Sequence, residues 1–180
     1  MMSDRDDGKG RRSIRLRDFD YSQEGGYFVT ICARGGRNLF GEVRNGVVAL
    51  NRLGGIVNQE WLRVAEKRDN VQLDIFVIMP NHLHGILLIG NSRRSMACHA
   101  QVTAPRKFGQ PLANSLSSIV GGFKSAVSRR INLERNSNSR FVWQRNYHEH
   151  IIRNEADLAE KRTYIQNNPL QWELDEYYRD

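Results

Sequence analysis

Two histidines separated by a single residue, His82 and His84, are the first feature of the sequence that could do chemistry. They belong to the stretch IMPNHLHGI at positions 78–86. Alternate side chains of a β-strand project from the same face, so on a strand both imidazoles point to one side. Two such imidazoles provide half of a divalent-metal site, although histidine pairs are also common as hydrogen-bonded or surface residues.

The residues around the pair predict the element that positions it. Apolar side chains alternate with polar ones before the pair, which predicts a strand with one buried face. Pro80-Asn81 then supplies turn chemistry, and the apolar run ILLI at 86–89 continues as a second strand. The histidines are therefore expected at the start of a central strand, within a hairpin. The residues of the first predicted buried face are Val71, Leu73, Ile75, Val77 and Met79.

A rival pair, His148 and His150, lies in a second predicted strand at 141–152. Here the intervening residue is Glu149, and no turn fixes the pair. We interpret His148 as an ordinary strand residue. His150 is expected to lie near the active site without binding a metal directly.

The last predicted helix carries a tyrosine that could act as a nucleophile. Asn154 is a suitable N-cap, the helix is expected from Glu155 to about Asn167, and Pro169 disfavours its continuation. Tyr164 lies beside the predicted buried stripe, and Asn168 follows four residues later. If the last turn persists, the phenol and the amide point the same way. Taken alone, a tyrosine at a helix margin is usually structural.

The remaining elements are predicted from apolar patterns and caps. The β-branched and aromatic run 27–33 indicates a core strand, and Asn45-Gly46 predicts a two-residue hairpin turn. Asn51 can cap a helix despite the cost of Gly54-Gly55. A further helix is expected to open at Asn114 or Ser115.

Composition and cysteine usage limit the class of protein. At 180 residues with 39% hydrophobic side chains, the chain predicts one globular domain. No apolar run approaches the roughly 20 residues of a membrane span, so no membrane partner is expected. Cys32 and Cys98 are interpreted as reduced thiols, which favours a cytoplasmic protein.

The charge of the chain favours a polyanionic partner. The net charge is +7, with a sequence pI near 9.8, and such a surface attracts a phosphate backbone and releases counterions. Generic basicity and a solvated helix face are the alternatives. One acid, Glu134, accompanies six basic residues between 115 and 145. The candidate DNA-binding residues are Lys124, Arg129, Arg130, Arg145 and Lys161.

Four short motifs, taken together, resemble the single-tyrosine HUH transposases. The motifs are MPNHLH at 79–84, FK at 123–124, WQ at 143–144 continuing to HIIR at 150–153, and YIQNNP at 164–169. This family comprises small insertion-sequence transposases and the REP-associated tyrosine transposases. The resemblance covers roughly 27–170. It implies an α+β fold, an antiparallel sheet flanked by helices that is similar to ferredoxin and RRM domains.

The resemblance also implies a site and an activity. His82 and His84 match the two histidines that bind a divalent cation, Mg²⁺ or Mn²⁺, and Asn168 matches the polar third ligand. Tyr164 matches the nucleophile. Members of the family cut and rejoin single-stranded DNA through a 5′-phosphotyrosyl link, and they often recognise a DNA hairpin. They act as monomers or as homodimers, so the tyrosine helix can serve its own subunit or its partner.

Three functions remain open at this stage. The leading one is a DNA strand-transferase with a single catalytic domain at 25–170, a flexible basic arm at 1–24, a loop insertion at 91–113 and a C-terminal tail at 171–180. The second is a DNA-hairpin or RNA-binding module that keeps the fold without cutting. The third is a metal-dependent hydrolase that uses His82, His84 and water and needs no tyrosine.

Overall fold

A four-stranded antiparallel sheet forms the centre of the computed structural model, which describes residues 24–90, 115–136 and 142–179. The predicted loop insertion and all but the last residue of the predicted arm lie outside these ranges. The strands follow the spatial order β4-β5-β1-β6. Their bounds are β1 Gly25–Cys32, β4 Val71–Ile78, β5 His82–Ile89 and β6 His148–Ile152.

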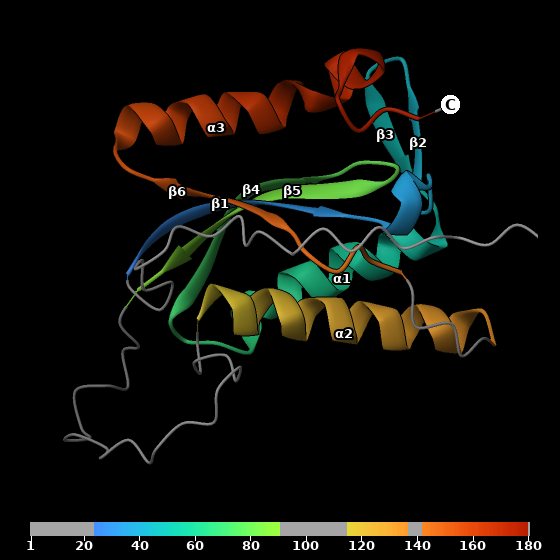
Figure 1. The fold of residues 1–180 in the computed structure, drawn as a ribbon, viewed down its shortest axis with the longest axis horizontal. Coiled ribbons are helices and arrows are strands. Elements are labelled where there is room, and N and C mark those ends of the chain that lie inside the picture. Colours follow the sequence, from blue (N-terminus) through green and yellow to red (C-terminus); the bar gives the residue numbers. More distant parts are fainter. Residues whose placement is uncertain (1–23, 91–114, 137–141, 180) are drawn as a thin grey trace, which may run out of the picture.

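Helices cover both faces of this sheet, in three layers (Figure 1). The helices α1 (Arg52–Glu66) and α2 (Leu116–Glu134) lie on one face, and α3 (Glu155–Asn167) lies on the other. A short 3-10 helix, η3 (Asn168–Leu174), continues from α3. This arrangement confirms the predicted α+β class.

A small hairpin, β2 (Gly41–Arg44) and β3 (Val47–Leu50), stands beside the sheet. Its turn places Asn45 and Gly46 at φ values of 52° and 73°. Both residues lie in the left-handed region that a type I′ turn requires, so the Asn-Gly prediction is confirmed. Another 3-10 turn, η1 (Arg34–Gly36), follows β1.

Side chains alternate along the central strands, so one face of the sheet packs against α1 and α2 and the other face carries the histidine pair. Tyr27, Val29 and Ile31 of β1 are fully buried in the core with residues of α1 and α2. In the neighbouring strand β5, Gly85 lies under Trp61 of α1, and a Cβ at this position would come within 2.6 Å of the indole. Residue 85 therefore faces α1, and the histidines on either side of Leu83 face α3.

Two strand predictions need correction. The single buried face expected from Val71 to Met79 is wrong, because the β4–β5 register shifts between Leu73 and Phe76. Such an irregularity reverses which residues face the helices. The strand expected at 141–152 is also too long. Among the described residues 142–152, only His148–Ile152 forms a strand, and Trp143 makes an isolated bridge to Ala33.

The predicted helix caps are confirmed. The Asn51 side chain accepts hydrogen bonds from two amides of α1, and that of Ser115 accepts one from Ser118. At α3, the Asn154 side chain accepts from the amide of Asp157. Among the described helices, none combines the length and the apolarity that crossing a bilayer requires.

Candidate functional site

The two imidazoles of His82 and His84 lie side by side on the α3 face of β5. Their ring centroids are 4.3 Å apart, and the two residues are 0% and 1% exposed. Strand β5 is central in the sheet, with β4 on one side and β1 on the other, so its backbone is paired on both sides. The predicted position of the pair, at the start of a central strand, is confirmed.

Hydrogen bonds orient both rings. Asn81 donates its amide hydrogens to the carbonyls of Gly36 and Tyr177, so its Oδ1 must accept from Nδ1 of His82, 2.8 Å away. Nδ1 of His84 lies 2.8 Å from the hydroxyl of Thr30 on β1. Nδ1 of His82 is therefore the donor, and its Nε2 keeps a lone pair. When the Thr30 hydroxyl accepts from Nδ1 of His84, Nε2 of that ring also presents its lone pair, toward the Tyr164 hydroxyl. Partners of this kind fix the tautomer of metal-binding histidines.

Burial keeps both imidazoles neutral. It lowers the pKa of His82 to about 4, although the carboxylate of Asp175 opposes this shift. Burial, followed by repulsion from His82, lowers the pKa of His84 well below its usual value. Neutral imidazole is the form that coordinates a metal, so both rings are in the ligand form at neutral pH.

Tyr164 of α3 reaches over the histidine pair. Its hydroxyl lies 3.5 Å from Nε2 of His84, and its ring packs edge-on against Phe28 of β1. The residue remains 40% exposed, so the phenol borders both the buried pair and solvent. Burial raises the pKa of Tyr164 to about 12, with added repulsion from Asp175 and Glu176.

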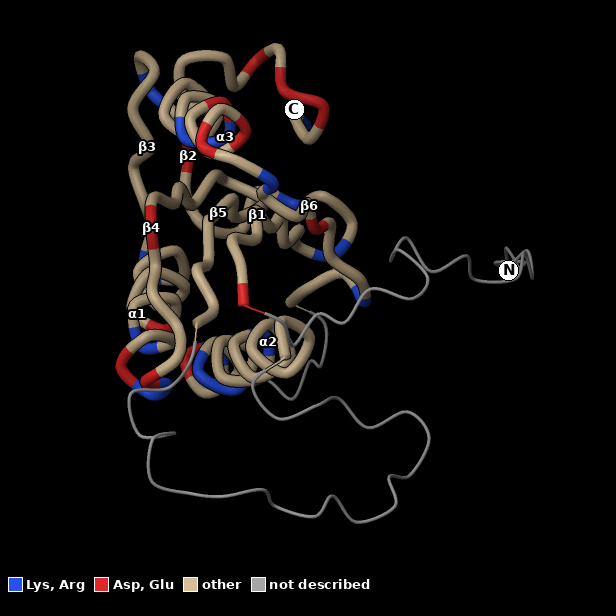
Figure 2. The backbone as a smooth tube through the Cα atoms, turned by 90° about the vertical axis from the view of Figure 1, so that its left-hand side faces the viewer, with Lys and Arg blue, Asp and Glu red and all other residues tan. Residues whose placement is uncertain are grey.

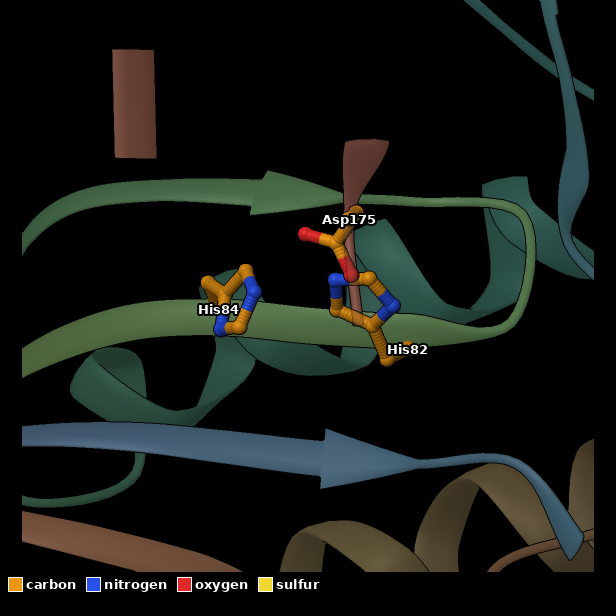
Figure 3. Close-up of side chains that lie close together, drawn as sticks. All are labelled: His82, His84 and Asp175. Atoms are coloured by element: carbon orange, nitrogen blue, oxygen red, sulfur yellow. The ribbon is translucent and has the colours of Figure 1, made fainter. Parts of the chain in front are cut away.

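Asp175 joins the site from the segment after η3, where the sequence predicted only a tail. Its carboxylate and the two imidazoles offer ligand atoms that lie within 4.8 Å of one another. Figure 3 shows the carboxylate reaching over the imidazole of His82. Asn168, which is 3% exposed, donates its side-chain amide to Asp175 at 2.6 Å. The sequence offered one weak signal for this position, the acidic and aromatic run DEYY at 175–178 in a basic chain.

The donor set fits a divalent cation. Nε2 of His82 and Oδ1 of Asn168 are both buried, and neither has a hydrogen-bond partner among the described residues. Both atoms are hydrogen-bond acceptors, so a second acceptor cannot satisfy either of them. A bound cation would satisfy both. The carboxylate of Asp175 adds the negative charge that a hard divalent cation favours.

A second phenol, Tyr177, borders the pair from the same C-terminal segment. Its ring centroid lies 4.8 Å from that of His82 and 6.0 Å from that of His84. Burial raises the pKa of Tyr177, and repulsion from Cys32 and Glu176 raises it further. Tyr177 was not predicted from the sequence for the same reason as Asp175: no local sequence pattern links residues 175–179 to the sheet.

The rival histidines lie on the α3 face of β6. His150 is opposite Phe28 in the register, and its Nε2 lies 2.9 Å from both carboxylate oxygens of Asp157 in the first turn of α3. His148 of β6 is opposite Thr30 of β1, and Thr30 is in turn opposite His84 of β5. The His148 ring centroid lies 6.5 Å from that of Tyr177. His150 therefore anchors α3, and His148 lies closer to the C-terminal segment.

The candidate DNA-binding residues are scattered over the molecule. Lys124 donates to the carbonyls of residues 144, 145 and 146, so its ammonium holds the chain before β6. Arg130 bonds Glu60 and Gln59 across α1 and α2, and Lys161 pairs with Glu160. The other two candidates, Arg129 and Arg145, are exposed.

Comparisons with known proteins give one close relative. No model of a known protein family matches the chain. An uncharacterized protein of Haemophilus influenzae (strain ATCC 51907 / DSM 11121 / KW20 / Rd) is 42% identical over 171 residues, which is 94% of each chain. The chain belongs to the family of that Haemophilus protein.

A solved structure shares the fold of this chain. It is described as a REP-associated tyrosine transposase bound to a REP hairpin. The two folds superpose with a TM-score of 0.58 and 19% identity, covering 91% of this chain and 74% of that one. This chain therefore has the fold of that solved structure, which confirms the predicted α+β fold.

Proposed function

We propose that the protein cuts and rejoins single-stranded DNA, with Tyr164 as the nucleophile. The observation that carries this proposal is the 3.5 Å separation between the Tyr164 hydroxyl and Nε2 of His84, beside an imidazole pair oriented for a cation. The transposase fold supports the same class of reaction, since the neighbour with that fold is itself described as a tyrosine transposase.

His82, His84 and Asp175 would hold the divalent cation, Mg²⁺ or Mn²⁺, with Asn168 beside them. When bound, the cation polarises a phosphate oxygen and stabilises the charge that develops during displacement at phosphorus. Asn168 holds the carboxylate of Asp175 through its amide, and Asn81 and Thr30 hold the two rings. The expected third ligand, Asn168, thus keeps its Oδ1 toward the site while its amide positions Asp175.

The proposed reaction exchanges a phosphodiester bond of the DNA for a phosphate ester of Tyr164. The Tyr164 oxygen forms a bond to phosphorus, and the bond from phosphorus to the 3′ oxygen of the preceding nucleotide breaks. The phenol loses a proton and the released 3′ oxygen gains one, so no redox partner or nucleotide cofactor is required. A later 3′-hydroxyl can attack the 5′-phosphotyrosyl link, reverse the exchange and join two strands.

Because the pKa of Tyr164 is raised, the site with its cation bound must favour loss of the phenol proton. A phenol with a pKa near 12 is almost entirely protonated at neutral pH. Asp175 and Glu176 contribute to that shift, and a cation among the ligands would neutralise part of their field. The ligand cluster therefore also prepares the nucleophile.

The test is a denaturing gel of protein incubated with labelled single-stranded hairpin DNA and Mn²⁺. We expect a denaturant-resistant band with the wild-type chain and none with Tyr164→Phe. The matched control is Tyr177→Phe, which removes the other phenol and should keep the band. Cleavage without a band would favour a hydrolase, and binding without cleavage would favour the non-cutting module; either result overturns the proposal.

A further inference from the structure

A small polar pocket adjoins the candidate metal site. Its volume is about 130 Å³, which corresponds to roughly four waters and suits a single flat ring system. Two of its lining residues also border the metal site: Asn81 orients His82, and the ring of Tyr177 lies 4.8 Å from that imidazole. We call this cavity the Tyr177 pocket, and its other lining residues are Cys32, Gly35, Gly36, Gln144 and Arg179.

The lining of the Tyr177 pocket offers hydrogen-bond donors and acceptors with little free charge. Burial raises the pKa of Cys32 to about 11, so its thiol is neutral at pH 7. Gln144 is exposed at the rim, and its side-chain amide presents both a donor and an acceptor. The guanidinium of Arg179 donates from Nη1 to the carbonyls of Glu176 and Tyr178. None of the described residues accepts from its other two nitrogens, which are therefore left for a ligand.

The surroundings of the pocket disfavour an anion inside it. Figure 2 shows acidic positions along the C-terminal segment, on the same side of the sheet as α3. Burial is the main cause of the raised pKa of Cys32, but the carboxylates of Asp175 and Glu176 raise it further, against an opposing effect of Lys124. A neutral heterocycle with donors and acceptors on its edge therefore matches the lining better than a phosphate does. A DNA base is such a group, and glutamine and arginine are side chains that pair with base edges.

The pocket also provides a surface for stacking and room beside it. The ring of Tyr177 is half-buried, and an aromatic ring of this kind stacks on any base. Gly35 and Gly36 have φ values of 69° and 65°, a conformation that favours glycine over residues with a side chain. A Cβ at Gly35 would meet nothing within 4 Å. Neither glycine fills the space that a base would need.

The order of residues along the sheet indicates which base would reach the pocket. Tyr164 contacts His84 and Phe28, whereas Cys32 of the pocket is opposite His82 in the β1–β5 register. The pocket thus lies beyond His82, on the side away from Tyr164. In a displacement at phosphorus, the attacking and leaving oxygens are roughly in line. With Tyr164 as the attacking group, the leaving 3′ oxygen points toward the end of the site that holds the pocket.

We propose that the Tyr177 pocket binds the base of the nucleotide on the 5′ side of the scissile phosphate, which is released with the 3′-hydroxyl. Tyr177 stacks on this base, and Gln144 and Arg179 pair with its edge. This inference rests on the proposed function and adds to it a place where protein side chains read the DNA base at the cut.

Mononucleotides test the pocket without any cleavage. The probes are the four deoxynucleoside 3′-monophosphates, their 5′-monophosphate isomers and 1,2-dideoxyribose 3-phosphate, which lacks the base. Each probe is titrated with Mg²⁺ into ¹⁵N-labelled protein, and the amide signals of Gly35, Gly36 and Gln144 report binding. The tightest 3′-monophosphate is expected to bind at least about fivefold more tightly than the baseless probe and than its own 5′ isomer. This ratio is the lower end of what stacking of one base contributes.

Variants assign the ratio to the pocket. Gln144→Ala and Tyr177→Leu should each lower the ratio of the 3′-monophosphate to the baseless probe, and Tyr177→Phe, which keeps the ring, should retain it. The matched control is Gln72→Ala, which removes an exposed glutamine of β4 outside the pocket and should leave the ratio unchanged.

Three results would overturn the proposal: equal binding of the baseless probe, tighter binding of the 5′ isomer, or a ratio that survives both Gln144→Ala and Tyr177→Leu. Because no nucleophile takes part, failure of the pocket is distinct from failure of the proposed function. The base ratio can be absent while the covalent adduct forms on the denaturing gel, and it can be present while no adduct forms.

Discussion

Asn168 donates its side-chain amide to the carboxylate of Asp175 at 2.6 Å, which joins the end of α3 to the C-terminal segment directly above the histidine pair. This contact turns a predicted tail into part of the candidate metal site. It also gives the ligand set a negative charge that two imidazoles and an amide lack.

Replacing Asp175 should therefore weaken metal binding. We expect Asp175→Asn to lower Mn²⁺ affinity by at least about tenfold, because the replacement removes the one anionic ligand. Electron paramagnetic resonance of free Mn²⁺ measures this without any DNA. Glu173→Gln removes an exposed acid of η3 and should leave the affinity unchanged; equal losses in both variants would argue against Asp175 as a ligand.

Acid should destabilise the metal-free protein through the buried imidazoles. The folded-state pKa of His82 is about 4, below its usual value of 6.5, so the unfolded chain binds protons first as pH falls. Stability contributed by the neutral ring is thus present above pH 6.5 and is lost progressively as pH drops toward about 4. Urea unfolding in the presence of a chelator, from pH 7 to pH 4, should show this loss in the wild type. A His82→Gln/His84→Gln variant should show a weaker pH dependence, and an identical one would refute the assignment.

Two adjacent glycines of α1 should respond in opposite directions to alanine. A Cβ on Gly54 would lie 2.0 Å from the carbonyl oxygen of Phe40, whereas one on Gly55 would meet nothing within 4 Å. Gly54→Ala is expected to destabilise the fold by about 1–3 kcal/mol or more. Gly55→Ala should stabilise it by about 1 kcal/mol through helix propensity. Thermal or urea unfolding measures both, and effects of the same sign would contradict the packing described here.

Lys124 is expected to matter for stability, because its ammonium donates to three backbone carbonyls. Lys124→Gln should lower the free energy of unfolding by about 1–3 kcal/mol, since those acceptors lose a charged donor. Lys161→Gln breaks only a surface pair with Glu160 and should cost less than about 1 kcal/mol. Equal unfolding free energies for the two variants would show that Lys124 does not hold this turn.

Local patterns were sufficient to predict most of the fold. Asn45-Gly46, the caps at Asn51 and Asn154, and the strand that begins at His82 all depend on residues close in sequence, so their chemistry is visible there. The register shift after Leu73 was not predictable, because the choice of which residue to bury is made by the partner strand β5.

The candidate site likewise contains residues that the sequence predicted and residues that it did not. The histidine pair and Tyr164 were found because each carries a motif, and the fold brings them together over 80 residues of sequence. Asp175 and Tyr177 were missed because they reach the site by a tertiary contact, through the amides of Asn168 and Asn81. No periodicity or spacing marks such a contact in a single sequence.

The most direct test of the central claim is to identify the residue that becomes linked to DNA. Adduct formed with Mn²⁺ and a single-stranded hairpin probe would be digested with nuclease and protease, and the peptides analysed by tandem mass spectrometry. We predict a nucleotide attached through its 5′ phosphate to Tyr164, with Tyr177 unmodified. A nucleotide on Tyr177 or on any other residue, or cleaved DNA with no modified peptide, would contradict the account.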